Sequence, residues 1–162
     1  MSGTTAWLNK LDEVKQKLKE KNATLFYAPN FSIGVNLFFK MNKVLAKLMN
    51  QHKNYNVEME EIHHLQKLDS PSGTAIKTAE GILKNLERKS IWKEAEEVRK
   101  NELKIHAKRE KGVSGTHAVH YFSEEDSVEL KHTAHSRKGF ALGSVLAAEW
   151  VFGKKGLPLG DR

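Results

Sequence analysis

The chain has 162 residues, a length at which one domain can bury a sizeable hydrophobic core. Its composition, 39% hydrophobic and 29% charged, is ordinary for a globular protein, and no apolar run is long enough to span a bilayer. The absence of cysteine excludes disulfides and thiolate chemistry, and the first residues show no secretory pattern. We therefore expect a cytoplasmic protein with no membrane partner.

The net charge of +7 admits a nucleic-acid-binding domain as one alternative. Most of the lysines, however, are interleaved with glutamate or glutamine, as in 15–21 and 93–100, which is typical of a solvated helix face. We therefore expect no nucleic-acid partner. The positive charge is interpreted instead as a field that attracts anionic small molecules.

The first third of the chain follows the order helix, strand, helix. Apolar residues at helical spacing predict a helix over 7–21, and the short apolar run 23–28 predicts a buried, parallel strand. A second helix over about 33–51 carries one apolar stripe, of the kind that faces a core. Its members are Ile33, Leu37, Met41, Val44, Leu45 and Leu48.

The patterns in the middle and at the end of the chain predict one strand, a helix, three further strands and a last helix. Alternation from Tyr55 predicts a half-exposed strand that runs into His63, and a helix follows with Pro71 at its first position. A charged connector at 91–100, for which a helix is one option, leads to strands at 103–110, 116–122 and 127–134. A last apolar helix spans 140–153, and we interpret its Trp150 and Phe152 as core residues. The predicted fold class is α/β (α+β), a mixed β-sheet with flanking helices.

The stretch E-I-H-H-L-Q-K-L-D-S-P-S-G-T, residues 61–74, concentrates the groups that can do chemistry. A helix that begins after Ser70 offers unpaired backbone N–H groups to an anion, and Lys67 adds a full positive charge. His63 and His64 are adjacent on a strand, so their side chains point to opposite faces and take different roles. One of them is expected near Lys67 as a proton-transfer group.

These residue types leave alternatives open. The S-P-S-G run at 70–73 can be a plain helix cap preceded by two surface histidines. The pairs His117/His120 and His132/His135 suggest a metal, but residues three apart on a strand point to opposite faces and cannot chelate together. We expect no metal site.

Four segments, in chain order, resemble the 4-hydroxy-tetrahydrodipicolinate reductase (dihydrodipicolinate reductase) family of the diaminopimelate route to lysine. They are G-T-T at 3–5, A-P-N-F-S-I-G-V-N at 28–36, the stretch 61–74, and H-T-A-H-S-R at 132–137 with G-F-A at 139–141. The stretch 61–74 is the most specific of them, and together they span nearly the whole chain.

The resemblance implies an enzyme of lysine biosynthesis that uses NADH or NADPH to reduce a cyclic unsaturated dicarboxylate, 4-hydroxy-tetrahydrodipicolinate. Carried over, His63 is the proton donor/acceptor and Lys67 a proton donor, while His64, Gly73 and Thr74 hold the substrate. A further set contacts the cofactor or helps to seat it: Gly3, Thr4, Thr5, Ala28, Pro29, Asn30, Phe31 and Arg137. The family also implies a homotetramer.

The resemblance further implies three parts: 1–32 as the end of a Rossmann-like cofactor domain, 33–136 as the substrate-binding and oligomerisation domain, and 137–162 as a helix that returns to the cofactor domain. Two features depart from the family. Ala6 stands where glycine is common, and no Gly-rich phosphate-binding turn is present. We therefore expect that most of the dinucleotide-binding domain is lacking. A non-catalytic substrate-binding or oligomerisation fragment is the alternative.

Overall fold

A computed structural model describes residues 1–3 and 7–157, and in it the chain divides into two compact units. One unit comprises Gly34–Arg137, and the other combines Met1–Ile33 with Lys138–Arg162 as far as it is described. Each unit is described below by itself. None of the described helices is long and apolar enough to cross a membrane.

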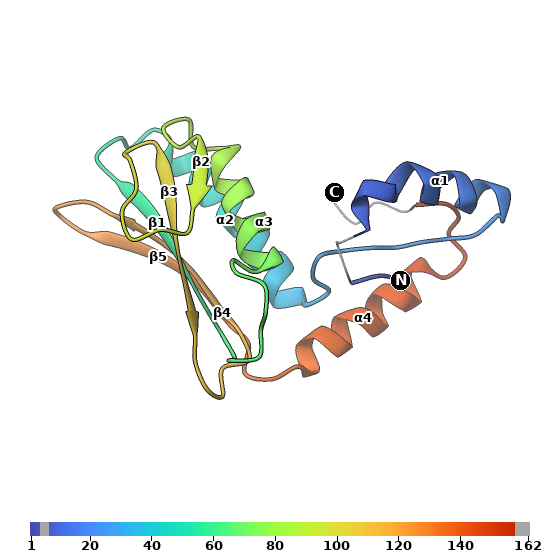
Figure 1. Cartoon of the computed structure of the whole chain (residues 1–162). Helices are drawn as coiled ribbons and strands as arrows, with labels where there is room; N and C mark the ends of the chain where they lie inside the picture. Colours follow the sequence, from blue (N-terminus) through green and yellow to red (C-terminus); the bar gives the residue numbers. More distant parts are fainter. Residues whose placement is uncertain (4–6, 158–162) are drawn as a thin grey trace. The chain divides into compact units, whose positions relative to one another are not determined.

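The larger unit contains a five-stranded mixed sheet in the order β2-β3-β1-β4-β5 (Figure 1). Its strands are β1 (Asn56–His63), β2 (Ile91–Lys93), β3 (Glu102–Arg109), β4 (Thr116–Phe122) and β5 (Ser127–Thr133). β3 runs parallel to both β1 and β2, whereas β4 runs antiparallel to β1 and β5. The predicted mixed sheet is therefore confirmed. The connector expected at 91–100 supplies the short edge strand β2, which the sequence did not predict.

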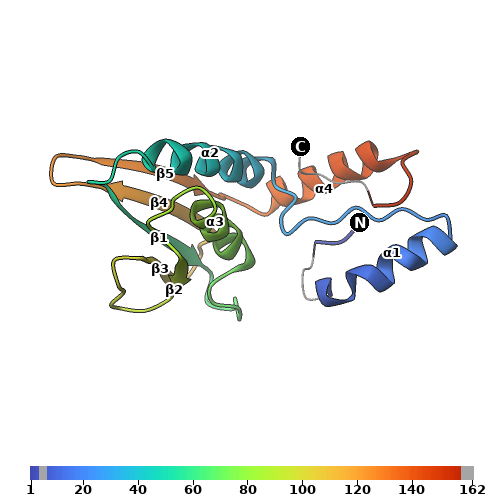
Figure 2. The same ribbon diagram turned by 90° about the horizontal axis from the view of Figure 1, so that it is seen from above.

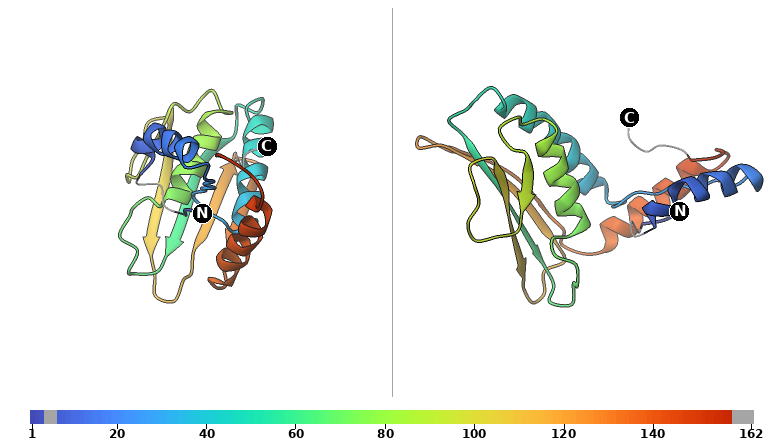
Figure 3. Two further views of the ribbon diagram at one scale, coloured as in Figure 1. Left: turned by 90° about the vertical axis from the view of Figure 1, so that its right-hand side faces the viewer. Right: turned by 45° about the horizontal axis from the view of Figure 1, so that its top comes forward.

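Two helices, α2 (Ile33–Met49) and α3 (Gly73–Leu83), cover one face of this sheet, as Figure 2 shows from above. Asn42 of α2 joins the helices by donating a hydrogen bond to the Thr78 carbonyl of α3, 2.9 Å away. The core lies between helices and sheet. It includes Phe38 and Phe39 of α2, Ala79 and Ile82 of α3, and Met59, Leu103 and Tyr121 of the strands. Figure 3 shows the same single helical layer from two further sides.

The apolar stripe predicted for the second helix lies mostly on the exposed side of that helix. Leu37, Met41, Val44 and Leu48 are 56 to 62% exposed, whereas Leu45 of the same stripe packs against the core. The buried positions include Val35, Phe38 and Phe39. The helix carries apolar residues on two sides, and the larger aromatic side chains take the core. This choice depends on packing with the sheet, which helical spacing alone does not contain.

The smaller unit contains α1 (Leu11–Glu20), preceded by the short 3-10 helix η1 (Leu8–Lys10), and α4 (Lys138–Val151). The strand expected at 23–28 is reduced to isolated parallel bridges, Ser2 with Tyr27 and Thr24 with Gly156. Each bridge joins one pair of residues, and single pairs among the described residues do not form a strand ladder. Gly143 of α4 lies so close to the Phe31 carbonyl that a Cβ there would come within 1.8 Å of its oxygen.

The prediction that Trp150 and Phe152 belong to the core is also wrong. Trp150 is 48% exposed and Phe152 is 89% exposed. The Trp150 ring contacts Phe26, with ring centroids 5.3 Å apart, and the Lys154 ammonium lies 4.4 Å from its centroid. Apolar character at the end of a helix indicated burial, but the described residues of this unit cover only part of these rings.

Candidate functional site

Two polar side chains take core-facing positions at the end of β1. The strand alternates strictly, so that Val57, Met59, Glu61 and His63 all point to the face covered by the helices. Glu61 has no exposed surface, and His63 is 8% exposed. A carboxylate and an imidazole thus continue the row of core residues into the site.

The buried carboxylate of Glu61 is held by groups from two other elements. Ser72, immediately before α3, donates its backbone N–H to Oε1 at 3.0 Å and its hydroxyl to Oε2. Arg109, at the end of β3, places Nη1 and Nη2 each 3.3 Å from Oε1. A buried carboxylate requires such partners, because an uncompensated charge there would be very costly.

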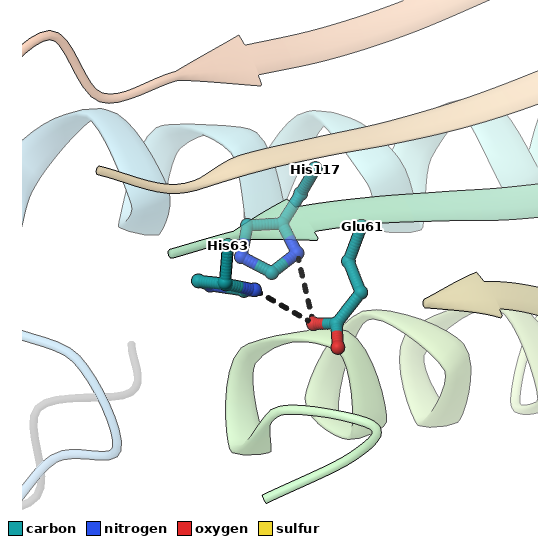
Figure 4. Close-up of side chains that lie close together, drawn as sticks. All are labelled: Glu61, His63 and His117. Atoms are coloured by element: carbon teal, nitrogen blue, oxygen red, sulfur yellow. Dashed lines mark ion pairs between the residues drawn. The ribbon is translucent and has the colours of Figure 1, made fainter. Parts of the chain in front are cut away.

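Two histidines approach the same carboxylate from the other side (Figure 4). Nδ1 of His63 lies 3.4 Å from Oε2 of Glu61, and Nδ1 of His117 lies 3.9 Å from it. The sheet register explains the second contact, since Glu61 and His117 are directly opposite in the β1–β4 pair. The imidazole rings meet edge to face, with centroids 5.0 Å apart.

Burial favours the neutral form of both imidazoles. It lowers the pKa of His63, an effect that Lys67 and Arg109 reinforce and Glu61 opposes. Burial also lowers the pKa of His117 to about 3, with smaller contributions from His63 and His132. Both rings are therefore neutral at pH 7, and each carries one N–H.

Glu61, His63 and His117 each offer one ligand atom, and these atoms lie within 4.8 Å of one another, so the geometry could hold a metal ion. The chemistry of the set opposes one. The carboxylate already accepts hydrogen bonds from Ser72, and the guanidinium of Arg109 beside it would repel a second cation. His120 and His117 do face opposite sides of β4, and His120 pairs with Glu129 at 3.2 Å.

Lys67, expected to serve an anion site at the start of the helix, already pairs with a carboxylate of this chain. Asp69 Oδ1 lies 2.7 Å from Nζ of Lys67. The hydrogen bond from Lys67 lowers the pKa of Asp69, and backbone N–H groups of Asp69 and Gly73 add to this effect. Arg109 fixes the loop by donating to the carbonyl oxygens of Lys67 at 3.4 Å and Asp69 at 2.6 Å.

The helix begins two residues later than predicted. Pro71 precedes the helix, Ser72 is the N-cap with its side chain accepting from the Ala75 N–H, and Gly73 is the first helical residue. Gly73 is exposed, and a Cβ there would meet nothing within 4 Å. His64 is half-buried and lies 3.2 Å from Oε1 of Gln66, on the other side of the strand from His63.

The residues expected to contact the cofactor lie mostly in the smaller unit. A Cβ at Gly3 would lie 3.7 Å from the Phe31 ring, and Ala28 donates its backbone N–H to the Ser2 carbonyl at 3.1 Å. Asn30 accepts a hydrogen bond from the Ser32 N–H at 2.8 Å. Thr4 and Thr5 lie outside the described residues, and Arg137 is exposed at the end of the larger unit.

Sequence reasoning missed four residues of this site: Glu61, Ser72, Arg109 and His117. A signal existed for Glu61, because alternation from Val57 places it on the buried face. Arg109 and His117 lie more than 40 residues from Glu61 along the chain, and only the register of the sheet brings them to it.

The comparisons with known proteins agree with this architecture. A family model described as dihydrodipicolinate reductase, C-terminus, matches residues 34–159. The 4-hydroxy-tetrahydrodipicolinate reductase of Christiangramia forsetii is 49% identical over 157 residues, which are 97% of this chain and 65% of that protein. The Aquifex aeolicus reductase is 42% identical, over 94% of this chain and 58% of its own length.

A solved structure shows the same fold. The dipicolinate-bound dihydrodipicolinate reductase from Paenisporosarcina sp. TG-14 aligns with a TM-score of 0.68 at 27% identity. The alignment covers 98% of this chain and 60% of that one. The chain spans between 54 and 65% of the length of the curated relatives that it matches. Because the family model covers 34–159, most of the sequence, the chain belongs to the dihydrodipicolinate reductase family.

Proposed function

We propose that this chain supplies the substrate-binding and proton-transfer groups for NAD(P)H-dependent reduction of 4-hydroxy-tetrahydrodipicolinate to tetrahydrodipicolinate, a step of lysine biosynthesis. The carboxylate of Asp69, which lies between Lys67 and the start of α3, carries this proposal. The position of this carboxylate indicates that the Lys67 charge and the nearby backbone N–H groups suit a carboxylate ligand. In the proposed complex a substrate carboxylate replaces Asp69.

His63 and Lys67 are the proposed proton-transfer groups, and His64, Gly73 and Thr74 are the proposed substrate ligands. Since His63 is neutral when the site is empty, it needs a change of environment to carry a proton. A dicarboxylate brings two negative charges, which raise the pKa of a nearby imidazole. Substrate binding would thus prepare His63 to donate a proton as the substrate is reduced.

The nicotinamide supplies the hydride when it is bound. Gly3, Thr4, Thr5, Ala28, Pro29, Asn30 and Phe31, with Arg137, are the residues proposed to contact it or help to seat it. The absence of a side chain at Gly3, beside the Phe31 ring, suits the close approach of a flat ring. The preference for NADH or NADPH belongs to a ribose-binding segment outside these residues.

The direct test is binding of pyridine-2,6-dicarboxylate, measured by calorimetry with the 162-residue chain. We expect saturable binding that weakens at least about tenfold in Lys67→Ala, since one charge-assisted hydrogen bond is lost. Lys53→Ala is the matched control, because Lys53 is an exposed lysine in the loop before β1. No saturable binding, or equal losses in both variants, would refute the proposed site.

A second candidate function, assembly, rests on the apolar row of α2. Leu37, Met41, Val44 and Leu48 form a contiguous exposed stripe, which is unusual for a surface that stays in water. We propose that a second copy of this chain covers it, in keeping with the tetramer that the family implies. Light scattering should then give a mass above 18.4 kDa that falls in Met41→Glu. A monomeric wild-type chain would contradict this.

A further inference from the structure

Glu61 connects the two halves of the proposed site. Its Oε1 faces Ser72 and Arg109, and its Oε2 faces the two histidines as well as the Ser72 hydroxyl. The same side chain therefore fixes the residue that caps α3 and lies beside the imidazole proposed to move a proton. It is fully buried and cannot itself contact a substrate.

The proton of a neutral histidine goes to the nitrogen that has an acceptor within reach. For His63 the nearest acceptor is Oε2 of Glu61, 3.4 Å from Nδ1. Without ligand the two atoms form no hydrogen bond, and this buried nitrogen has no hydrogen-bond partner among the described residues. His117 approaches the same oxygen but stops at 3.9 Å. Catalytic hydrogen bonds of this kind are often long without ligand and shorten when substrate is bound.

The other nitrogen of His63 is then the one that can exchange a proton. A Cβ at Gly115 would lie 3.3 Å from Nε2, so the glycine leaves room beside this nitrogen. With the proton on Nδ1, Nε2 carries a lone pair and can receive a proton and pass it on.

We propose that Glu61 is a positioning residue, which holds His63 in the tautomer protonated on Nδ1 and so reserves Nε2 for proton exchange with substrate. The role of Nε2 rests on the proposed function; the control of the tautomer does not. A carboxylate that orients a histidine in this way makes it a better base and keeps the ring in one orientation.

The substitution Glu61→Gln tests this directly. Both guanidinium contacts of Arg109 go to Oε1, and the Ser72 N–H lies closer to Oε1 than to Oε2, at 3.0 Å against 3.2 Å. The carbonyl oxygen of the new amide is therefore expected at the position of Oε1. Its NH₂ group would then take the position of Oε2 and donate towards Nδ1 of His63. We expect the variant to invert the tautomer, with the proton moving to Nε2.

The measurement is long-range ¹H–¹⁵N NMR of the chain labelled with ¹⁵N-histidine, at pH 7, with and without pyridine-2,6-dicarboxylate. We expect His63 of the wild-type chain to be protonated on Nδ1, and protonated on Nε2 in Glu61→Gln. Glu58→Gln is the matched control: it lies on the same strand, faces the other side, and has its own histidine partner, His106, at 3.2 Å. It should leave the His63 signals unchanged.

A wild-type His63 protonated on Nε2 would overturn the proposal, and so would a tautomer that Glu61→Gln does not change. If Glu61→Gln does not fold, the wild-type tautomer decides. Ser72→Ala then serves as a second variant, which removes one partner of Oε2 but should keep the wild-type tautomer. A chain that shows the expected tautomers but does not bind pyridine-2,6-dicarboxylate would contradict the proposed function alone.

In a preparation that turns over substrate, Glu61→Gln should lower kcat about 10²-fold, the usual contribution of a placed proton-transfer group. KM should change much less, and the pH dependence of kcat should shift. A purely structural role would instead lower kcat and kcat/KM through loss of folded protein, without moving the pH profile. That result would also overturn the proposal.

Discussion

The carboxylate of Asp69 lies 2.7 Å from the Lys67 ammonium, which is the group proposed to receive a substrate carboxylate. The two anions would compete for one cation and for the backbone at the start of α3. Ligand binding at this site therefore includes the cost of breaking the internal pair. A pair of this exposure contributes at most about 1 kcal/mol.

Asp69→Asn should accordingly strengthen the binding of pyridine-2,6-dicarboxylate about threefold to fivefold, because the competing charge is removed. Isothermal titration calorimetry measures the change. Asp12→Asn removes a comparable ion pair, with Lys15 at 2.9 Å, and should leave the affinity unchanged. Weaker binding in Asp69→Asn would show that Asp69 orients Lys67 rather than competing for it.

A side chain at Gly73 should obstruct the ligand without disturbing the fold. Because a Cβ there meets nothing within 4 Å, Gly73→Val should change the free energy of unfolding by no more than about 1 kcal/mol. The branched side chain would nevertheless cover the N–H groups at the helix start, and affinity for pyridine-2,6-dicarboxylate should fall at least about tenfold. Gly73→Ala should give a smaller loss. Wild-type affinity in Gly73→Val would exclude the helix start as a ligand site.

A glycine at position 115 should be required to keep the His63 ring in its place. Gly115→Ala places a Cβ 3.3 Å from Cδ2 and Nε2 of His63, so the ring must shift by a few tenths of an ångström. We expect displaced His63 resonances in the NMR spectrum and a lower melting temperature. Gly112→Ala is matched, since its φ is also positive, at +80° against +150°, but its Cβ meets nothing within 4 Å. Equal changes of the His63 resonances in both variants would show that backbone strain, and not contact with the new Cβ, displaces the ring.

The buried His117 should make the fold sensitive to acid. Its pKa is about 3 in the folded chain against 6.5 for the free side chain, so below pH 6.5 the unfolded chain binds more protons. The free energy of unfolding therefore falls as the pH is lowered from 6.5 towards 3, by up to about 1.4 kcal/mol per pH unit. His117→Gln removes this contribution. Between pH 7 and pH 5 the free energy of unfolding of the variant should therefore fall by about 2 kcal/mol less than that of wild type.

Urea unfolding at the two pH values measures this difference. His120→Gln, on the half-exposed side of the same strand, is the control and should behave as wild type. An unchanged pH dependence in His117→Gln would show that the acid sensitivity arises elsewhere.

Local patterns predicted most of the larger unit. Alternation located β1, turn residues separated β3, β4 and β5, and helical spacing located α2 and α3. Three residues of β2 were too few for a pattern, and the exposed side of α2 was mistaken for its core side. Both errors arise where tertiary packing, rather than local sequence, decides the structure.

The candidate site divides in the same way. His63, Lys67 and Gly73 are close in sequence, so their chemistry could be recognised there. The partners of Glu61 could not, because their proximity results from strand pairing. His63 pairs in register with Arg109 across β3, and Glu61 pairs with His117 across β4.

Ser72 and Arg109 hold the Glu61 carboxylate from two directions, so hydrogen bonds join β1, β3 and the start of α3 before any ligand arrives. Side chains that are already fixed lose little conformational entropy on binding, which otherwise costs about 0.5–1.5 kcal/mol for each one ordered. Most of the ordering entropy of complex formation should therefore come from the ligand and from the Lys67 side chain, which must leave Asp69 to meet it.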